Sequence, residues 1–211
     1  MSGLLPNIQA AVERIQSLIN STSDRILIGI AGKPGAGKST LSQKLLELMN
    51  SENIAVLSMD GFHLSNKVLA TLGRADRKGA PDTFDVASFV SLLRRIRSER
   101  DSHIYFPIFD RKIEESIAAQ GEINSETKLV LVEGNYLLHY EDGWQNVANI
   151  LDEIWYIELD DELRIERLIA RHMAFGKNET AAKQWARGSD ERNAELIASG
   201  AKRANYVIRL D

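Results

Sequence analysis

Residues 32–39 read Gly-Lys-Pro-Gly-Ala-Gly-Lys-Ser, the spacing of a loop that wraps around a chain of phosphates. Its glycines let the main chain curl until several N–H groups face one anion, and a following helix adds its positive end. A short apolar run precedes the loop at 25–31, and leucines at helical spacing follow it. We therefore expect a nucleoside triphosphate to bind through Gly32, Lys33, Pro34, Gly35, Ala36, Gly37, Lys38, Ser39 and Thr40.

Two side chains of this loop and one acid far away in the sequence would balance the negative charge of the phosphates, directly or by holding Mg²⁺. Lys38 supplies a mobile positive charge for the β- and γ-phosphates, and the Ser39 hydroxyl is a ligand for Mg²⁺. Residues 129–132 form another apolar run, which ends in Glu133, and a carboxylate there would hold the same ion through its water shell. The alternative for Glu133 is a surface acid at the end of a strand.

Asp60 follows directly on the apolar run 54–59. In an open parallel sheet the carboxyl ends of the strands face the ligand crevice. Asp60 is therefore predicted to be the catalytic base, which accepts a proton from a substrate hydroxyl as that oxygen attacks the γ-phosphorus. The alternative is an aspartate that caps the next turn.

Arg164, Arg167 and Arg171 stand at i, i+3 and i+7 on one face of an expected helix. An arginine row aimed at the phosphates would spread the charge of the transition state, whereas the alternative is a solvated basic face. Glycines bracket the polar stretch that follows, and we interpret residues 164–190 as a lid that excludes water from the γ-phosphate.

Apolar strands alternate with amphipathic helices along the chain, and these elements must bring the candidate residues together. Strands are expected at 25–31, 54–59, 129–132, 154–159 and 206–210. This alternation predicts an α/β fold, a three-layer sandwich with a mainly parallel five-stranded sheet. We expect a single domain over 1–211, with an N-terminal helix at 1–21 and an insertion on the acceptor side at 101–126.

The composition excludes several classes of protein. Among 211 residues, 26 Lys and Arg stand against 30 Asp and Glu, and this net charge of −4 argues against a protein that grips a nucleic acid polymer. Cysteine is absent, so neither a disulfide nor a thiolate metal site can form. We see neither a signal peptide nor an apolar run of about 18 residues, and so expect a cytoplasmic protein without a membrane partner.

Several further motifs occur in a fixed order after the phosphate loop. They are MDGFH at 59–63, KGAPDTFD at 78–85, PIFDR at 107–111, VEGNYLL at 132–138 and the arginine helix. Together they resemble the phosphoribulokinase/uridine kinase family of P-loop kinases, in its pantothenate-kinase-like branch, which includes proteins named as fructose-transport-system kinases. The resemblance spans roughly residues 25–210.

This resemblance implies ATP-dependent phosphorylation of a small-molecule hydroxyl. It assigns the base to Asp60, the third-strand acid to Glu133 and the lid arginines to Arg167 and Arg171. The segment near the acceptor falls on Tyr105, Phe109, Asp110 and Arg111, and His63 would hydrogen-bond an acceptor hydroxyl or have a structural role. Arg171-His172 stands where uridine kinases carry Arg-Asp, and Phe109 replaces their acceptor-loop tyrosine, which weighs against uridine.

We therefore predict a phosphotransferase that uses ATP and Mg²⁺ and acts on a sugar, nucleoside or pantothenate-like alcohol. The alternative is a nucleotide-binding regulator or an ATPase without an acceptor. A switch GTPase would need Asn-Lys-x-Asp, and the sole Asn-Lys pair, at 66–67, lacks the aspartate. The acceptor, the choice between ATP and GTP, and the oligomeric state, a homodimer included, are left open.

Overall fold

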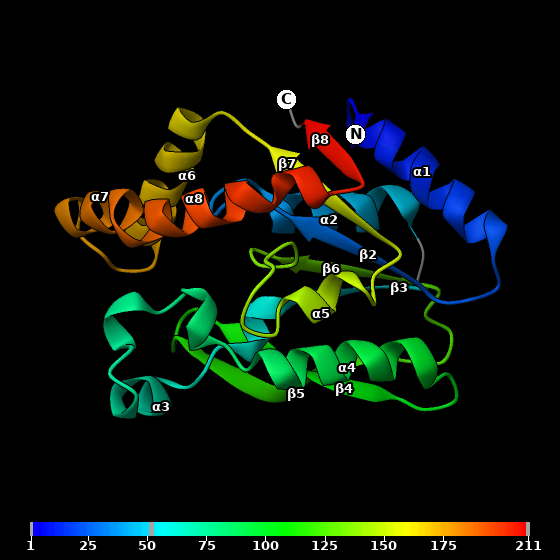
Figure 1. Ribbon diagram of the computed structural model, residues 1–211, viewed down its shortest axis with the longest axis horizontal. Coiled ribbons are helices and arrows are strands. Elements are labelled where there is room, and N and C mark those ends of the chain that lie inside the picture. Colours follow the sequence, from blue (N-terminus) through cyan, green and yellow to red (C-terminus); the bar gives the residue numbers. More distant parts are fainter. Residues whose placement is uncertain (1, 51–52, 210–211) are drawn as a thin grey trace.

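A computed structural model describes residues 2–50 and 53–209, and its centre is a six-stranded sheet in the order β1-β8-β7-β2-β6-β3 (Figure 1). All the pairings within this sheet are parallel. The strands are β1 (Gly3–Leu5), β2 (Ile26–Ala31), β3 (Ile54–Ser58), β6 (Leu129–Gly134), β7 (Glu153–Glu158) and β8 (Tyr206–Arg209).

Helices cover both faces of the sheet and complete the three layers. Helices α1 (Ile8–Ser21) and α2 (Lys38–Met49) pack on one face. On the other face lie α4 (Val86–Ser98), the short α5 (Gln145–Ala148) and part of α8 (Ser189–Gly200). Successive residues of a strand point to opposite faces, so Ile28 joins the first layer of side chains and Leu27 the second. Two-sided burial explains the nearly continuous apolar runs of these strands.

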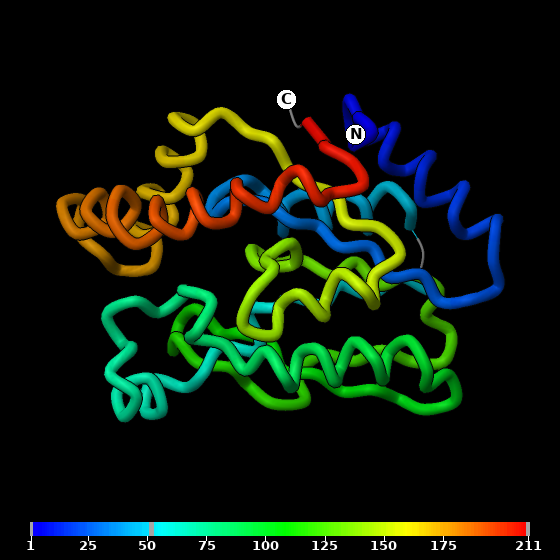
Figure 2. Tube along the Cα trace, viewed as in Figure 1, coloured from blue at the N-terminus to red at the C-terminus, as the bar shows by residue number. Residues whose placement is uncertain are grey.

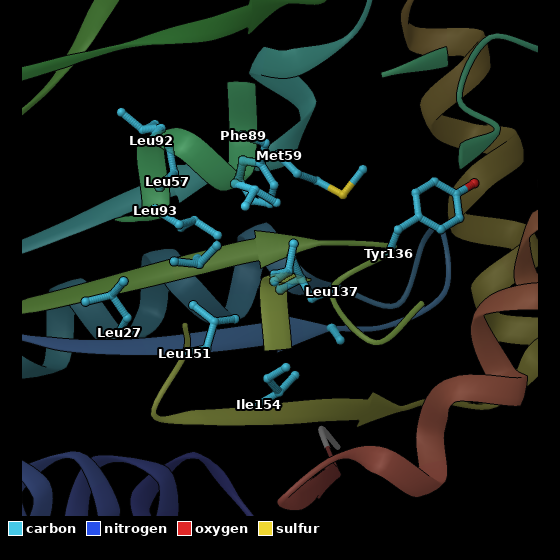
Figure 3. Close-up of a cluster of buried hydrophobic side chains, with 14 of the residues drawn as sticks. Leu27, Leu57, Met59, Phe89, Leu92, Leu93, Tyr136, Leu137, Leu151 and Ile154 are labelled. Atoms are coloured by element: carbon cyan, nitrogen blue, oxygen red, sulfur yellow. The ribbon is translucent and has the colours of Figure 1, made fainter. Parts of the chain in front are cut away.

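The larger of the two cores gathers aliphatic side chains of the strands around Phe89 of α4 (Figure 3). Tyr136 lies at the edge of this cluster, and Figure 3 shows its hydroxyl pointing away from the aliphatic groups. That hydroxyl donates to the main-chain oxygen of Gly79 at 2.6 Å. The core is therefore tied to the segment that carries the 78–85 motif.

Residues 104–123 form an antiparallel hairpin outside the main sheet, made of β4 (Ile104–Asp110) and β5 (Glu115–Ile123). The hairpin lies against the turn at Met59–Phe62 so closely that a Cβ on Gly61 would be 2.1 Å from the oxygen of Pro107. Glycine is therefore required at this point of the 59–63 motif. The contact places the PIFDR segment beside the end of β3.

The remaining helices lie near the carboxyl ends of the strands. These are α3 (Asn66–Thr71), α6 (Asp161–Ala174) and α7 (Glu179–Arg187), and Figure 2 shows the chain of α6 to α8 folding back on itself. Asp160 and Asn178 cap α6 and α7 by accepting main-chain N–H groups. None of the helices in the described residues is long and apolar enough to cross a membrane.

The α/β class and the mainly parallel sheet are confirmed, but the predicted number of strands is wrong. The sixth strand is β1, whose three residues are too few to show a period, and it pairs with β8 at the edge of the sheet. The N-terminal helix consequently begins at Ile8, after Asn7 caps it. The last predicted strand extends to Leu210, which lies outside the described residues.

Candidate active site

A cavity of about 740 Å³ opens at the carboxyl ends of β2, β3 and β6. Its walls come from the glycine loop, the turn after β3, the hairpin, residues 75–84 and helices α6 to α8. The carboxyl ends of the strands form the edge where ligands bind in open α/β sheets.

The glycine loop is preformed. Gly35 and Gly37 have φ of 80° and 94°, in the left-handed region, and Gly37 is the N-cap residue of α2. Lys38 extends back along the loop and its Nζ donates to the main-chain oxygens of Gly32 at 2.9 Å and Lys33 at 3.1 Å. Burial lowers the pKa of Lys38 to about 8, against the opposing effect of Asp60 and Glu133.

Helical spacing groups Arg164 with Arg167 and Arg171 as a row aimed at the phosphates, but the structure places Arg164 elsewhere. Its side chain is fully buried beneath the loop, where it donates to the oxygen of Pro34 at 3.3 Å. It also pairs with Asp161 at 2.8 Å and with Glu191 of α8 at 2.6 Å. A Cβ on Gly35 would lie 2.8 Å from the Arg164 oxygen, so α6 packs directly on the loop. Arg164 thus joins the loop, α6 and α8, and does not line the cavity.

Asp60 lies in the cavity at the end of β3, with its side chain 28% exposed. Its Oδ2 accepts a hydrogen bond from Arg111 Nη2 at 2.9 Å. Burial alone would raise the pKa of Asp60, but the combined effect of His63, Arg111, Lys38 and Arg171 outweighs it and holds the pKa below its ordinary value. Asp60 is therefore ionised at neutral pH.

His63 is packed between Phe84 and Phe109, with ring centroids 4.0 and 4.7 Å away. Its Nδ1 lies 2.8 Å from the main-chain oxygen of Asp60, and since a carbonyl oxygen can only accept, Nδ1 carries the proton. Burial lowers the pKa of His63, so the ring is neutral at pH 7 and its Nε2 is left as an acceptor.

Ser39 and Glu133 meet across the strand ends, where the serine hydroxyl donates to Glu133 Oε1 at 3.0 Å. Glu133 is only 8% exposed, and its Oε2 is buried without a hydrogen-bond partner among the described residues. Burial and the nearby Asp60 raise the pKa of Glu133. A hydroxyl beside an unpartnered buried carboxylate oxygen suits a hard cation that arrives with phosphates, directly or through its water shell. No cluster of three or more acids and histidines stands ready for a metal in the described part of the chain.

Arg167 and Arg171 of α6 line the cavity, and neither forms an ion pair in the part of the chain that is described. Burial lowers the pKa of Arg171, as does the nearby Arg111. The next residue, His172, is 2.7 Å from Asp190 Oδ2, which links α6 to α8. These two arginines are cations without a carboxylate partner, a state that an anionic ligand would relieve.

Most of the predicted site residues share this one cavity. The exceptions in the loop are Gly32, Lys33 and Ala36, which do not line the cavity. Pro34, Gly35, Gly37, Lys38, Ser39, Thr40, Asp60, His63, Phe109, Arg111, Glu133, Arg167 and Arg171 line the cavity.

The structure does not bring Tyr105 and Asp110 to the cavity. Tyr105 alternates with the buried Phe106 on β4, so it faces outward, 55% exposed and stacked on His103. Asp110 turns back to accept the N–H of Lys112 at 2.7 Å. Their placement therefore gives no support to the contact with the acceptor that was predicted for them.

Several cavity residues were absent from the sequence prediction. Lys78 opens the KGAPDTFD motif, which was the available signal, although the motif alone does not show where its lysine points. Asp190 and Asn193 of α8 also line the cavity, as do Phe175 and Trp185. Nothing in the periodicity of α7 and α8 distinguishes these residues from ordinary packing.

Known proteins resemble this chain over most of its length. A profile of the phosphoribulokinase/uridine kinase family matches residues 27–209. A Schizosaccharomyces pombe protein named as a candidate uridine kinase is 32% identical over 160 residues, which are 72% of this chain and 68% of that protein. The pantothenate kinase of Enterococcus faecalis is 29% identical over 142 residues, 65% of this chain and 46% of the enzyme.

The structural comparison agrees with the sequence. The crystal structure of a candidate fructose transport system kinase from Silicibacter sp. TM1040 superimposes with a TM-score of 0.86 and 32% identity. The match covers 95% of this chain and 98% of that protein. The sheet, the loop and the helices around the cavity thus belong to an arrangement found in other kinases.

Proposed function

Because the chain belongs to the phosphoribulokinase/uridine kinase family and is a phosphotransferase, we propose that it transfers the γ-phosphoryl group of ATP to a hydroxyl of a sugar, nucleoside or pantothenate-like metabolite. The observation that carries the proposal is that Asp60 and the phosphate loop share one cavity. A loop alone would support binding or hydrolysis, whereas an ionised carboxylate beside it supplies the base for an alcohol.

The loop residues 32–40 bind the phosphates in this proposal. The main-chain N–H groups between Gly35 and Ser39 and the N-terminus of α2 supply fixed positive poles. Lys38 exchanges its two main-chain acceptors for phosphate oxygens when the nucleotide enters. That exchange costs little because the lysine keeps hydrogen bonds in both states.

Ser39 and Glu133 are the residues that would hold Mg²⁺. When bound, the ion neutralises charge on the β- and γ-phosphates. The buried, unpartnered Oε2 of Glu133 is the feature of the chain that supports this assignment. The Ser39 hydroxyl, which donates to Glu133 in the structure, would turn its lone pairs to the ion instead.

Asp60 is the proposed base. The acceptor oxygen forms a bond to the γ-phosphorus, the bond from that phosphorus to the β,γ-bridging oxygen breaks, and ADP leaves with the bonding electrons. The hydroxyl proton passes to the Asp60 carboxylate. The neutral His63, with Nε2 as an acceptor, helps to orient the hydroxyl.

Arg167 and Arg171 stabilise the charge that spreads over the transferred group, and α6 and α7 act as the lid. Arg164 holds this lid helix on the loop without touching the nucleotide. Arg167 and Arg171 therefore stand on a helix, α6, that the buried side chain of Arg164 attaches to α8 by an ion pair and to the loop by a hydrogen bond.

A test of the proposal is a screen of hydroxyl metabolites for ADP release from MgATP, with a blank that lacks an acceptor. We expect at least one alcohol to raise ADP release well above the blank and to yield a phosphorylated product by mass spectrometry. Rapid release in the blank, unchanged by any alcohol, would support an ATPase instead. Binding of ATP without release in any mixture would support a nucleotide-binding regulator.

A further inference from the structure

Lys78 places a positive charge in the cavity that the transfer chemistry does not use. Its Nζ donates to Asn66 Oδ1 at 2.7 Å and to the main-chain oxygen of Glu114 at 2.5 Å. Both acceptors are uncharged, and within the described residues no carboxylate forms an ion pair with this ammonium. Burial lowers the pKa of Lys78 despite the nearby Glu114 and Glu115. The ammonium thus contacts only neutral oxygens, and the nearby Glu114 and Glu115 form no ion pair with it in the part of the chain that is described.

Lys78 lies at the end of the cavity away from the phosphate loop. The Phe109 ring is 4.7 Å from the His63 ring and 5.1 Å from Lys78 Nζ, while the Arg111 guanidinium is 6.0 Å from the same ring. The charge of Lys78 acts on His63, whereas the charges that act on Lys38 come from Asp60, Glu133, Arg171 and Arg111. Lys78 therefore lies beyond the base, on the acceptor side.

Two of the acids near this end have partners. Glu115 accepts the N–H of Asn66 at 2.9 Å, and Asp190 pairs with His172. Arg111 pairs with Asp60 itself. The acceptor side of the cavity thus presents two cations, Lys78 and Arg111, beside Glu114, which also lines it. Arg111 is shared with the catalytic carboxylate.

We propose that the acceptor alcohol carries an anionic group, a carboxylate or a phosphate ester, which binds between Lys78 and Arg111 while its hydroxyl faces Asp60 and His63. This inference rests on the proposed kinase function and narrows its substrate class. An anion supplies the direct ion-pair partner that Lys78 lacks among the described residues and offers Arg111 a second partner. As Arg111 turns toward that anion, Asp60 loses a neighbouring positive charge and becomes a stronger base. A neutral alcohol does neither.

The experiment compares matched pairs of alcohols that differ in the anionic group. Glycerate with glycerol and pantothenate with panthenol test a carboxylate, and ribose 5-phosphate with ribose tests a phosphate; further pairs extend the screen. For each pair, kcat/KM for acceptor-dependent ADP release is measured at saturating MgATP. The ratio within a pair, taken on one enzyme sample, cancels partial inactivation of a variant.

We expect the wild type to favour the anionic member of at least one pair. Lys78→Met should lower that ratio by about 30- to 1,000-fold, because one charge partner of the anion is lost. Lys78→Arg should keep most of the preference. Lys67→Met removes an exposed lysine of α3 outside the cavity and should leave the ratio unchanged.

The outcomes separate this inference from the proposed function. Phosphorylation of neutral alcohols in preference to anionic ones, or a ratio that Lys78→Met leaves unchanged, would overturn the inference and leave the kinase function standing. If no alcohol raises ADP release above the blank, the kinase function fails and this inference fails with it.

Discussion

The charge of Lys38 should depend on whether a triphosphate is bound. In the structure its ammonium contacts two neutral main-chain oxygens, and burial brings its pKa to about 8. Bound phosphates would surround the same group with negative oxygens and raise the pKa again. Since binding favours the protonated form, the protein must take up a proton whenever the free lysine is neutral.

The size of this uptake follows from the pKa. With a pKa of about 8 in the free protein, roughly 0.1 of the lysine is neutral at pH 7, about 0.5 at pH 8 and about 0.9 at pH 9. These fractions are the protons taken up per nucleotide bound. The affinity for ATP should accordingly fall toward tenfold per pH unit above pH 8. Phosphate groups, with a second pKa of about 6, are already ionised in this range.

Calorimetry of ATP binding in two buffers with different enthalpies of ionisation measures the uptake directly. The number of protons is expected to rise from pH 7 to pH 9. Lys38→Met should abolish the rise, whereas Lys44→Met, on the exposed side of the same helix, should preserve it. An uptake that is flat across this range, or one that survives in Lys38→Met, would refute the reasoning.

Three further substitutions test other parts of the site. Asp60→Asn should lower kcat by about 10²–10⁴ with little change in ATP affinity, while Asp76→Asn on an exposed turn should be neutral in the same assay. Arg164→Met should lower the free energy of unfolding by about 2–4 kcal/mol in denaturant titrations, because two partly exposed carboxylates lose a fully buried partner; no change would mean that the network contributes little. Glu133→Gln should raise the Mg²⁺ concentration that half-saturates MgATP binding by about 10- to 100-fold, and an unaltered Mg²⁺ dependence would contradict its assignment to the ion.

The parts of the fold that could be predicted are those with a strong period. The strands β2, β3, β6 and β7 are apolar because both of their faces pack against buried side chains. The glycine loop lies between β2 and the amphipathic helix α2. The three-residue β1 carries no period and gains its place through pairing with β8, an interaction between residues about 200 positions apart. Sequence patterns do not report such contacts.

The candidate site was predictable where a residue is fixed by the end of a strand. Asp60 follows β3 and Glu133 lies near the end of β6, and the parallel pairing of these two strands carries both side chains to one edge of the sheet. The hairpin residues were harder to predict. The register of the two strands is irregular between Phe106 and Ile108, and Phe109 lines the cavity whereas Tyr105 does not. The side chain of Asp110 turns back to the main chain. Helical spacing placed Arg164 with its neighbours, but the close contact of α6 with Gly35 buries it.

The order of the strands has a consequence for how the protein is made. β8 lies between β1 and β7, so the first strand of the chain has no neighbour in the sheet until residues 206–208 have been synthesised. The ribosome must add about 200 residues after residues 3–5 before these two strands can pair. Because strands that are so far apart in the sequence pair slowly, the pairing of β1 with β8 is expected to be a late event of folding.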